Sequence, residues 1–163
     1  METTSQQFLS VIENNKGILY KVSGLYTTNE EDRKDLIQEI IFQLWRSFEK
    51  YDSNFKISTW LYRIALNVSI SYYRKEKNRE EFSHPLSSDI FSMEEEEKPL
   101  SEELKLLQTF IKELKELDRA LIILFLDGKS QKEIAEILGL SETNVSTKVG
   151  RIKSYLKKRF ETA

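Results

Sequence analysis

The chain has 163 residues, of which 39% are hydrophobic and 32% charged, so its composition supports a modest core and excludes disorder throughout. The absence of cysteine excludes disulfides, zinc–thiolate sites and thiol nucleophiles, and it suits a reducing compartment. The formal net charge of −2 argues against a nucleic-acid partner, but the charges are distributed unevenly, and a polyanion responds to the local patch.

The N-terminal residues carry no secretory signal pattern, because no basic stretch precedes an apolar run in residues 1–10. The longest apolar run, residues 120–126, is far shorter than the roughly 18 residues that a membrane span requires. We therefore expect a soluble cytoplasmic protein without membrane insertion.

Apolar residues in the N-terminal half recur with helical spacing, and no convincing alternating strand pattern occurs. A first helix is predicted over residues 5–21. A second helix has a predicted core-facing stripe that consists of Leu36, Ile37, Ile40, Ile41, Leu44, Trp45 and Phe48. A third helix begins near Ser58, and its predicted core face consists of Leu61, Ile64, Ala65, Val68 and Tyr72.

The outward face of the second helix carries polar and charged residues beside Phe42 and Trp45, namely Asp35, Gln38, Glu39, Gln43 and Arg46. Aromatic residues at the edge of a polar stripe are typical of protein–protein contacts. An ordinary solvated surface is an equally good interpretation of this stripe from its residues.

The third helix has a second stripe opposite its predicted core face, made of Arg63, Asn67, Ile70 and Arg74. Five basic residues and one acid, Glu76, lie within residues 63–79. Basic and amide groups interleaved with aromatic rings are typical of sites for single-stranded nucleic acid. The preceding loop offers Asn54, Phe55 and Lys56 for an unstacked base, whereas Trp60 and Tyr72 are expected in the core rather than facing a ligand.

An acidic stretch separates the two halves of the chain. Residues 89–103 contain seven acids against one lysine, Lys98, and the prolines Pro85 and Pro99 bracket the run Glu94, Glu95, Glu96 and Glu97. We predict a flexible acidic linker over residues 80–100, between domains at 1–79 and 101–163. An acidic surface helix is the alternative interpretation.

The C-terminal part is predicted to hold four shorter helices. The first is amphipathic through Leu104, Leu107, Ile111, Leu114 and Leu117, and Asp118 is a candidate cap for the next. The fold class is therefore all-α: an N-terminal bundle of three to four helices, the flexible acidic linker, and a C-terminal four-helix domain.

Residues 130–158 carry the most specific pattern, a helix-turn-helix. Ser130 and Glu133 match a capping box, Ala135 permits close helix crossing, Gly139 suits the sharp turn, and Ser141 is a good N-cap. Leu140 is expected to fill the turn. The inner face of the second helix is predicted to be Val145, Val149, Ile152 and Leu156.

The outward face of that helix is basic and hydrogen-bonding, which is typical of a helix that enters the major groove of DNA. Its candidate DNA-binding residues are Glu142, Thr143, Asn144, Ser146, Thr147, Lys148, Arg151 and Lys153. Lys153, Lys157 and Lys158 could bind phosphates. A helical hairpin with a solvated basic face is the alternative interpretation.

Catalysis is not expected from this sequence. The single histidine, His84, lies in the predicted linker, and the five glycines are scattered rather than grouped in a phosphate-binding loop. We predict no catalytic residues, no metal site and no cofactor.

Two blocks together resemble an extracytoplasmic-function (ECF) sigma factor of the sigma-70 family. Region 2 is matched by DLIQEIIFQLWRSF (residues 35–48) and STWLYRIALNVSISYYRK (58–75). Region 4 is matched by SQKEIAEILGLSETNVSTKVGRIKSYLKKRF (130–160). The order and separation of the blocks make the resemblance strong.

The resemblance implies roles that the residues left open. A contact with the β′ coiled coil of core RNA polymerase would use Asp35, Gln38, Glu39, Phe42 and Arg46. The melted strand of the −10 element would meet Asn54, Phe55, Lys56 and Asn67, extended by the basic stripe of Arg63 and Arg74. The helix from Glu142 to Lys153 would read the −35 element, and the β flap and an anti-sigma factor would be further partners.

Two features qualify what the resemblance implies. Ser146 and Gly150 stand where many members have a lysine and a histidine, so the bases read at −35 cannot be copied from a relative. Twenty extended residues reach about 66–72 Å, roughly two turns of B-DNA, so the linker could let one chain hold both elements. Its acidic run is further expected to imitate nucleic acid in the polymerase cleft.

Two other functions would explain part of the sequence. A conventional helix-turn-helix regulator would explain residues 130–158, but it gives no purpose to the stripe of Arg63, Asn67 and Arg74. A helical interaction module would not need the helix-turn-helix spacing.

Overall fold

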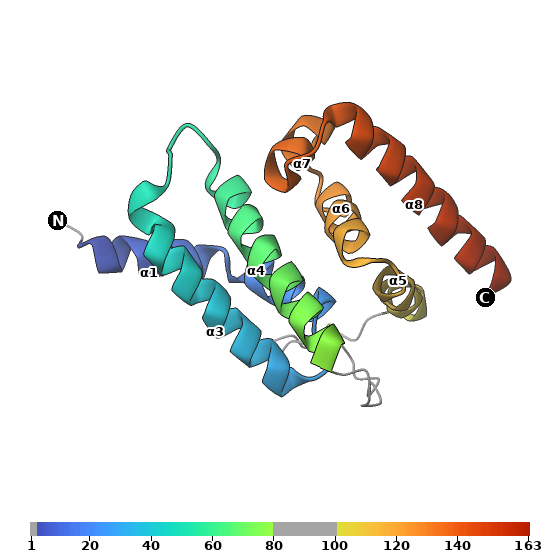
Figure 1. Ribbon diagram of the computed structural model, residues 1–163, viewed down its shortest axis with the longest axis horizontal. Helices are drawn as coiled ribbons and strands as arrows, with labels where there is room; N and C mark the ends of the chain where they lie inside the picture. Colours follow the sequence, from blue (N-terminus) through green and yellow to red (C-terminus); the bar gives the residue numbers. More distant parts are fainter. Residues whose placement is uncertain (1–2, 80–100) are drawn as a thin grey trace. The chain divides into compact units, whose positions relative to one another are not determined.

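The computed structural model describes residues 3–79 and 101–163, which form eight α-helices and one short 3-10 helix (Figure 1). The chain divides into two compact units, Met1–Ser92 and Met93–Ala163. The predicted all-α class is confirmed. The predicted linker at 80–100 lies outside the described residues, so the three segment boundaries and the role of the acidic run stay predictions.

The first unit is built from α1 to α4. Its elements are α1 (Thr4–Asn14), α2 (Lys16–Leu25), α3 (Glu30–Ser47), the 3-10 helix η1 (Phe48–Lys50) and α4 (Ile57–Arg79). Helices α3 and α4 pack side by side, and α2 packs against both of them (Figure 1). The large side chains Leu19, Leu25 and Tyr62 are fully buried in this unit.

The prediction of a single helix over residues 5–21 is wrong, because the chain forms two helices that meet at Asn15. The backbone of Asn15 leaves the helical region, with φ −131° and ψ 18°, and its side-chain amide donates to the Val11 carbonyl at 2.8 Å. Asparagine competes for backbone hydrogen bonds and glycine is a poor helix former. The sequence Asn14-Asn15-Lys16-Gly17 therefore favours a break that the apolar spacing concealed.

Helix α3 begins earlier than the predicted stripe, at an N-cap made by Asn29. The Asn29 side chain accepts from the Asp32 backbone at 2.7 Å, and three acids in the first turn complement the helix dipole. The buried apolar face is narrower than predicted and consists of Leu36, Ile40 and Leu44. Trp45 is 43% exposed, so its assignment to the core face is wrong.

The buried face of α4 overlaps the predicted one only at Leu61 and Ala65. Its fully enclosed side chains are Leu61, Tyr62, Ala65, Leu66 and Ser69. Ile64, Val68 and Tyr72 are only partly buried. Ile70 is 9% exposed, so its assignment to the outward stripe is wrong, because it borders the buried face around Leu66.

The second unit consists of α5 (Glu102–Lys112), α6 (Glu116–Leu126), α7 (Gln131–Leu138) and α8 (Glu142–Thr162). Helix α8 packs against the other three helices of this unit. At 21 residues α8 is not one of four short helices, as the sequence suggested. The core includes the fully buried Leu121, Ile122, Leu124 and Ile134.

The turn between α5 and α6 depends on a buried arginine. Arg119 is 6% exposed and donates to the carbonyls of Lys112 and Leu114, both at 2.8 Å, so it satisfies acceptors at the end of α5. Asp118 was predicted to cap α6 and does not, because α6 starts at Glu116 and its N-cap position is Lys115. Along residues 3–79 and 101–163, no helix has the length and apolar character to cross a membrane.

Candidate functional site

The start of the helix-turn-helix has the predicted capping box. The Glu133 backbone donates to the Ser130 hydroxyl at 3.1 Å, and the Ser130 backbone donates to the Glu133 carboxylate at 3.0 Å. These bonds satisfy donors that the first turn of α7 would otherwise leave unpaired. The capping-box prediction is confirmed.

The turn also has the predicted geometry. Gly139 has φ 72° and ψ 35°, a left-handed conformation that favours glycine, and its N–H donates to the Ala135 carbonyl at 2.8 Å. The Leu140 N–H donates to the same carbonyl at 3.1 Å. Ser141 then caps α8 by accepting from the Asn144 backbone at 3.1 Å. The turn fixes the direction in which α8 leaves α7.

Helix α8 is held by one buried face and presents the opposite one. The predicted inner residues Val145, Val149, Ile152 and Leu156 are all buried. The residues predicted to read DNA are exposed, except for the half-buried Lys148: Glu142, Thr143, Asn144, Ser146, Thr147, Arg151 and Lys153. The structure therefore brings the predicted DNA-reading residues to the surface of a single helix.

Lys153 differs from the other predicted DNA contacts in its surroundings. Its ammonium lies 5.1 Å from the ring centroid of Phe125, which belongs to α6. A cation over an aromatic face gains modest electrostatic stabilisation. The Lys153 side chain thus lies toward α6, at the edge of the exposed face of α8.

A polar cluster of three residues ties α8 to the end of α5, and sequence analysis missed it. Arg159 donates to both carboxylate oxygens of Glu113, at 2.8 and 2.7 Å, and the Tyr155 hydroxyl donates to the same carboxylate at 2.6 Å. The Arg159 and Tyr155 hydrogen bonds lower the pKa of Glu113 to about 2, and the bond to Glu113 raises the pKa of Tyr155. Glu113 and Arg159 are 46 residues apart, so no local pattern could have revealed the pair.

A shallow hollow lies on the exposed side of α8, beyond its first two turns. It is lined by Gly150, Arg151, Ser154, Tyr155 and Lys158. None of these residues is acidic. The cluster at Glu113 fixes the tyrosine that forms one wall.

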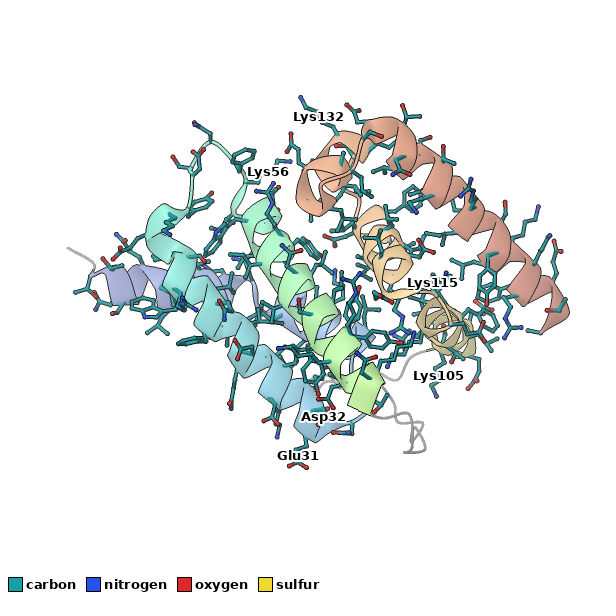
Figure 2. The ribbon with its side chains drawn as sticks, in the orientation of Figure 1. Glu31, Asp32, Lys56, Lys105, Lys115 and Lys132 are labelled. Carbon is teal, nitrogen blue, oxygen red and sulfur yellow. The ribbon has the colours of Figure 1, made fainter. Side chains whose placement is uncertain are left out.

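In the first unit, the loop before α4 is ordered by local hydrogen bonds. The Asp52 side chain accepts from the Asn54 backbone at 2.9 Å, and the Phe55 backbone donates to the Asp52 carbonyl at 3.0 Å. Asn54, Phe55 and Lys56 are exposed, and Figure 2 shows Lys56 at the loop end of α4. The acids Glu31 and Asp32 lie at the opposite end of this unit (Figure 2).

A chain of aromatic contacts supports this loop. Trp60 lies 5.3 Å from Tyr51 and 6.0 Å from Phe48, and Phe48 lies 5.3 Å from Phe8, measured between ring centroids. Aromatic pairs at these separations stabilise each other beyond simple burial. Trp60 is half-buried, so its role is to hold the loop against α4 rather than to sit wholly in the core.

The exposed side of α4 continues from that loop. The Arg63 guanidinium lies 5.8 Å from the Phe55 ring centroid, which joins the helix to the loop. Asn67, one turn further, and Arg74, two turns beyond it, are exposed. The structure therefore brings Phe55, Arg63 and Asn67 onto adjoining parts of one surface.

The outer face of α3 presents the residues that the resemblance assigns to polymerase. Asp35, Gln38, Glu39 and Arg46 are exposed, and Phe42 is 54% exposed, with the Arg46 guanidinium 5.7 Å from its ring centroid. An aromatic ring this exposed on a charged face is typical of a protein contact.

A hollow between α3 and α4 is lined by residues from two surfaces. The α3 surface was predicted to bind polymerase, and the α4 surface was predicted to bind the melted −10 strand. The hollow is lined by Glu39, Gln43, Asn67, Val68, Ser71, Tyr72 and Lys75. Gln43 donates to Glu39 at 2.9 Å within it. Ser71 and Lys75 were not predicted, although both follow Asn67 at helical spacing.

Comparison with known families matches both units. The model of Sigma-70 region 2 matches residues 11–79, and the model of Sigma-70 region 4 matches residues 104–156. The chain belongs to the ECF sigma factors of the sigma-70 family. The match over the first unit decides against a conventional helix-turn-helix regulator, because a regulator of that kind would not need region 2.

Similar curated proteins include two from Bacillus subtilis (strain 168). The ECF RNA polymerase sigma factor SigW is 28% identical over 168 residues, which cover 93% of this chain and 88% of SigW. The RNA polymerase sigma factor SigZ is 32% identical over 128 residues, which cover 78% of this chain and 72% of SigZ.

Two solved structures share the fold. CnrH in complex with the cytosolic domain of CnrY has a TM-score of 0.70 and 21% identity, covering 98% of this chain and 90% of that one. The sigma factor RpoE in complex with the anti-sigma factor NepR from Bartonella quintana has a TM-score of 0.74 and 19% identity, covering 96% of each chain. These structures show the fold, whereas the matches to both Sigma-70 regions and to the curated relatives show that the chain is an RNA polymerase sigma factor that directs transcription initiation at promoters.

Proposed function

We propose that the exposed face of α8 reads the −35 element as duplex DNA. The observation that carries this proposal is the fixed orientation of α8, whose inner face is buried while Thr143, Asn144 and Thr147 are exposed at its leading end. Hydroxyl and amide groups at the start of a recognition helix can bond to base edges, and Lys148 and Arg151 supply charge for phosphates.

We propose that the loop before α4 and the exposed face of α4 bind the melted strand of the −10 element. Support comes from the placement of Phe55, Arg63 and Asn67 on adjoining surfaces, with Asn54 and Lys56 in the same loop. An exposed aromatic ring can stack an unpaired base, an amide can bond to its edge, and arginine can hold the backbone. Arg74 extends the basic surface along α4. Capture of unstacked bases would favour melting of the duplex.

We propose that the outer face of α3 binds the β′ coiled coil of core polymerase through Asp35, Gln38, Glu39, Phe42 and Arg46. Support comes from their common exposure and from Phe42, whose ring is more than half accessible. The second unit would contact the β flap. An anti-sigma factor is a further proposed partner, because the similar RpoE structure is a complex with an anti-sigma factor.

We assign residues 1–79 to core and −10 binding, 80–100 to the linker and 101–163 to −35 binding. Sigma factors are generally initiation factors without enzymatic activity, and we propose that this one acts in the cytoplasm without catalysis of its own.

Footprinting of the holoenzyme on a promoter fragment tests the DNA assignments. The wild-type chain should protect the −35 duplex and make thymines near −10 reactive to permanganate. Asn67→Ala should reduce the permanganate signal near −10 and leave protection of the −35 duplex in place. Thr147→Ala should reduce protection of the −35 duplex and leave the permanganate signal in place. Identical footprints for the two variants would contradict the division of labour.

A further inference from the structure

Gly150 is a glycine that the fold of the chain does not require. It lies in the interior of α8 and does not have a positive φ, unlike Gly128 and Gly139. A Cβ atom built on Gly150 meets nothing within 4 Å among the described residues. Because glycine is among the least favourable residues inside a helix, alanine would suit α8 better.

The position of Gly150 indicates a role for this glycine in ligand binding. Gly150 lies on the same exposed side of α8 as Thr147 and Arg151, and it lines the hollow with Arg151, Ser154, Tyr155 and Lys158. Two of these side chains are cationic and two carry hydroxyls, of which that of Tyr155 already donates to Glu113. The hollow therefore has the chemistry of a site for a phosphodiester rather than for a cation or an apolar ligand.

Helix geometry separates this hollow from the part of α8 that can read bases. Eight residues separate Glu142 from Gly150, which corresponds to about 12 Å along a helix at 1.5 Å per residue. In helix-turn-helix proteins the N-terminal residues of the recognition helix contact the base edges. A position about 12 Å further along the helix lies beyond those turns, where we expect it to face the sugar–phosphate backbone.

One wall of the hollow is held in place by the second unit itself. The Tyr155 hydroxyl donates to Glu113 at 2.6 Å, and Arg159 holds the same carboxylate at 2.8 and 2.7 Å. The Tyr155 ring is thereby fixed before DNA binds. A site whose side chains are already held in place loses less conformational entropy on binding.

We propose that Gly150 is a positioning residue for promoter binding: it lets one phosphodiester of the −35 element approach the backbone of α8, between Arg151 and Lys158. This inference rests on the proposed −35 function of α8 and goes beyond it, because it assigns a single backbone contact to a residue without a side chain. A side chain at position 150 would hold the phosphate away from α8, whereas base reading by the first turns would persist.

The test uses the full chain in holoenzyme, with a promoter fragment in which each phosphate of the −35 element is replaced in turn by a neutral methylphosphonate. Wild-type binding should weaken at a small number of positions. Gly150→Leu should bind about tenfold more weakly, because the leucine side chain holds the phosphate away from Arg151 and Lys158 and weakens a charge-assisted hydrogen bond from one of them. At one of those positions Gly150→Leu should no longer respond to the neutral phosphate.

Two further variants keep the result interpretable. Gly150→Ala should raise the thermal midpoint by about 2–4 °C while weakening binding, which separates the effect from misfolding. Gly17, in the first turn of α2, is also exposed and has nothing within 4 Å of a built Cβ, so Gly17→Leu is the matched control and should leave −35 binding unchanged.

The inference would be overturned if Gly150→Leu bound as tightly as wild type, or if it stayed sensitive at every phosphate to which wild type responds. A change in base preference with all phosphate responses intact would also overturn it. Failure of the proposed function would look different, because the wild-type holoenzyme itself would then show no protection of the −35 element.

Discussion

Arg159 of α8 holds Glu113 at the end of α5 through two hydrogen bonds, of 2.8 and 2.7 Å, across 46 residues of sequence. Both oxygens of the carboxylate are engaged, and Tyr155 adds a third bond at 2.6 Å. The pair fastens the C-terminal half of α8 to the rest of its unit. The charge of Arg159 is thereby committed within the unit, so we assign the DNA contacts of α8 to its other basic residues.

Glu113→Gln should lower the free energy of unfolding at pH 7 by about 1 kcal/mol, since the bonds are charge-assisted but partly exposed to solvent. The pKa of Glu113 is about 2 in the folded chain against an ordinary value of 4.5. A carboxyl group whose pKa is lower in the folded chain than in the unfolded chain stabilises the fold at pH values above the unfolded pKa. This stabilisation is lost as the pH falls toward the folded pKa. The difference in free energy of unfolding between Glu113→Gln and wild type should therefore shrink as the pH falls from 4.5 to about 2.

Urea unfolding of both proteins across this pH range measures the difference. Glu161→Gln, at an exposed position on the same helix, is the control and should show no comparable pH dependence. If the loss of unfolding free energy in Glu113→Gln stayed constant down to about pH 2.5, the ion pair would not be the source of that loss.

Ser69→Ala should stabilise the first unit. The Ser69 hydroxyl is fully buried in α4 and has no hydrogen-bond partner among the described residues. An unsatisfied buried hydroxyl costs free energy, and alanine also suits a helix interior better, so we expect a gain of about 1 kcal/mol. Thermal unfolding beside Ser10→Ala, at an exposed position of α1, separates the two contributions. An equal gain in stability in both variants would mean that the buried Ser69 hydroxyl does not destabilise the fold.

Replacing Lys148 and Arg151 together with alanine should weaken holoenzyme binding to promoter DNA and reduce its salt dependence. For each phosphate that the variant no longer neutralises, the slope of log K against log salt should fall by about 0.9. Binding titrations from about 50 to 200 mM salt measure the slope. Lys105→Ala on α5, outside the helix-turn-helix, is the control. A double variant with the wild-type slope would remove these residues from the interface.

Charge reversal on α3 should abolish binding to core polymerase. Asp35→Lys and Glu39→Lys each place a cation on the face proposed for the β′ coiled coil, where like charges would cost several kcal/mol. A pull-down with core enzyme measures binding, and circular dichroism checks that both variants keep their helices. Glu161→Lys makes the same charge change on α8 and should bind normally. Retention of either α3 variant at the wild-type level would exclude that residue from the contact.

Sequence reasoning succeeded where the deciding interactions are local. The capping box of Ser130 and Glu133, the left-handed Gly139 and the N-cap Ser141 each depend on neighbours within a few residues. The inner face of α8 followed from helical spacing for the same reason. The family resemblance was carried by these short patterns together with the region 2 motif.

Sequence reasoning failed where tertiary packing decides. Spacing gave a core face for α4 that included Leu61, but packing against α2 and α3 buries a face that also takes in Leu66 and Ile70. Apolar character placed Trp45 in the core, although much of its ring remains accessible. The bonds between Glu113 and α8 depend on how α5 and α8 pack together, so the spacing of residues along the chain cannot reveal them.

Run-off transcription with purified core polymerase and a library of genomic fragments is the sharpest test of promoter-directed initiation by this chain. We expect discrete transcripts that core polymerase without this chain does not make, from start sites that share one sequence near −35 and another near −10. Transcripts that do not depend on the chain, or that start at sites without either shared sequence, would show that it does not select promoters in this way.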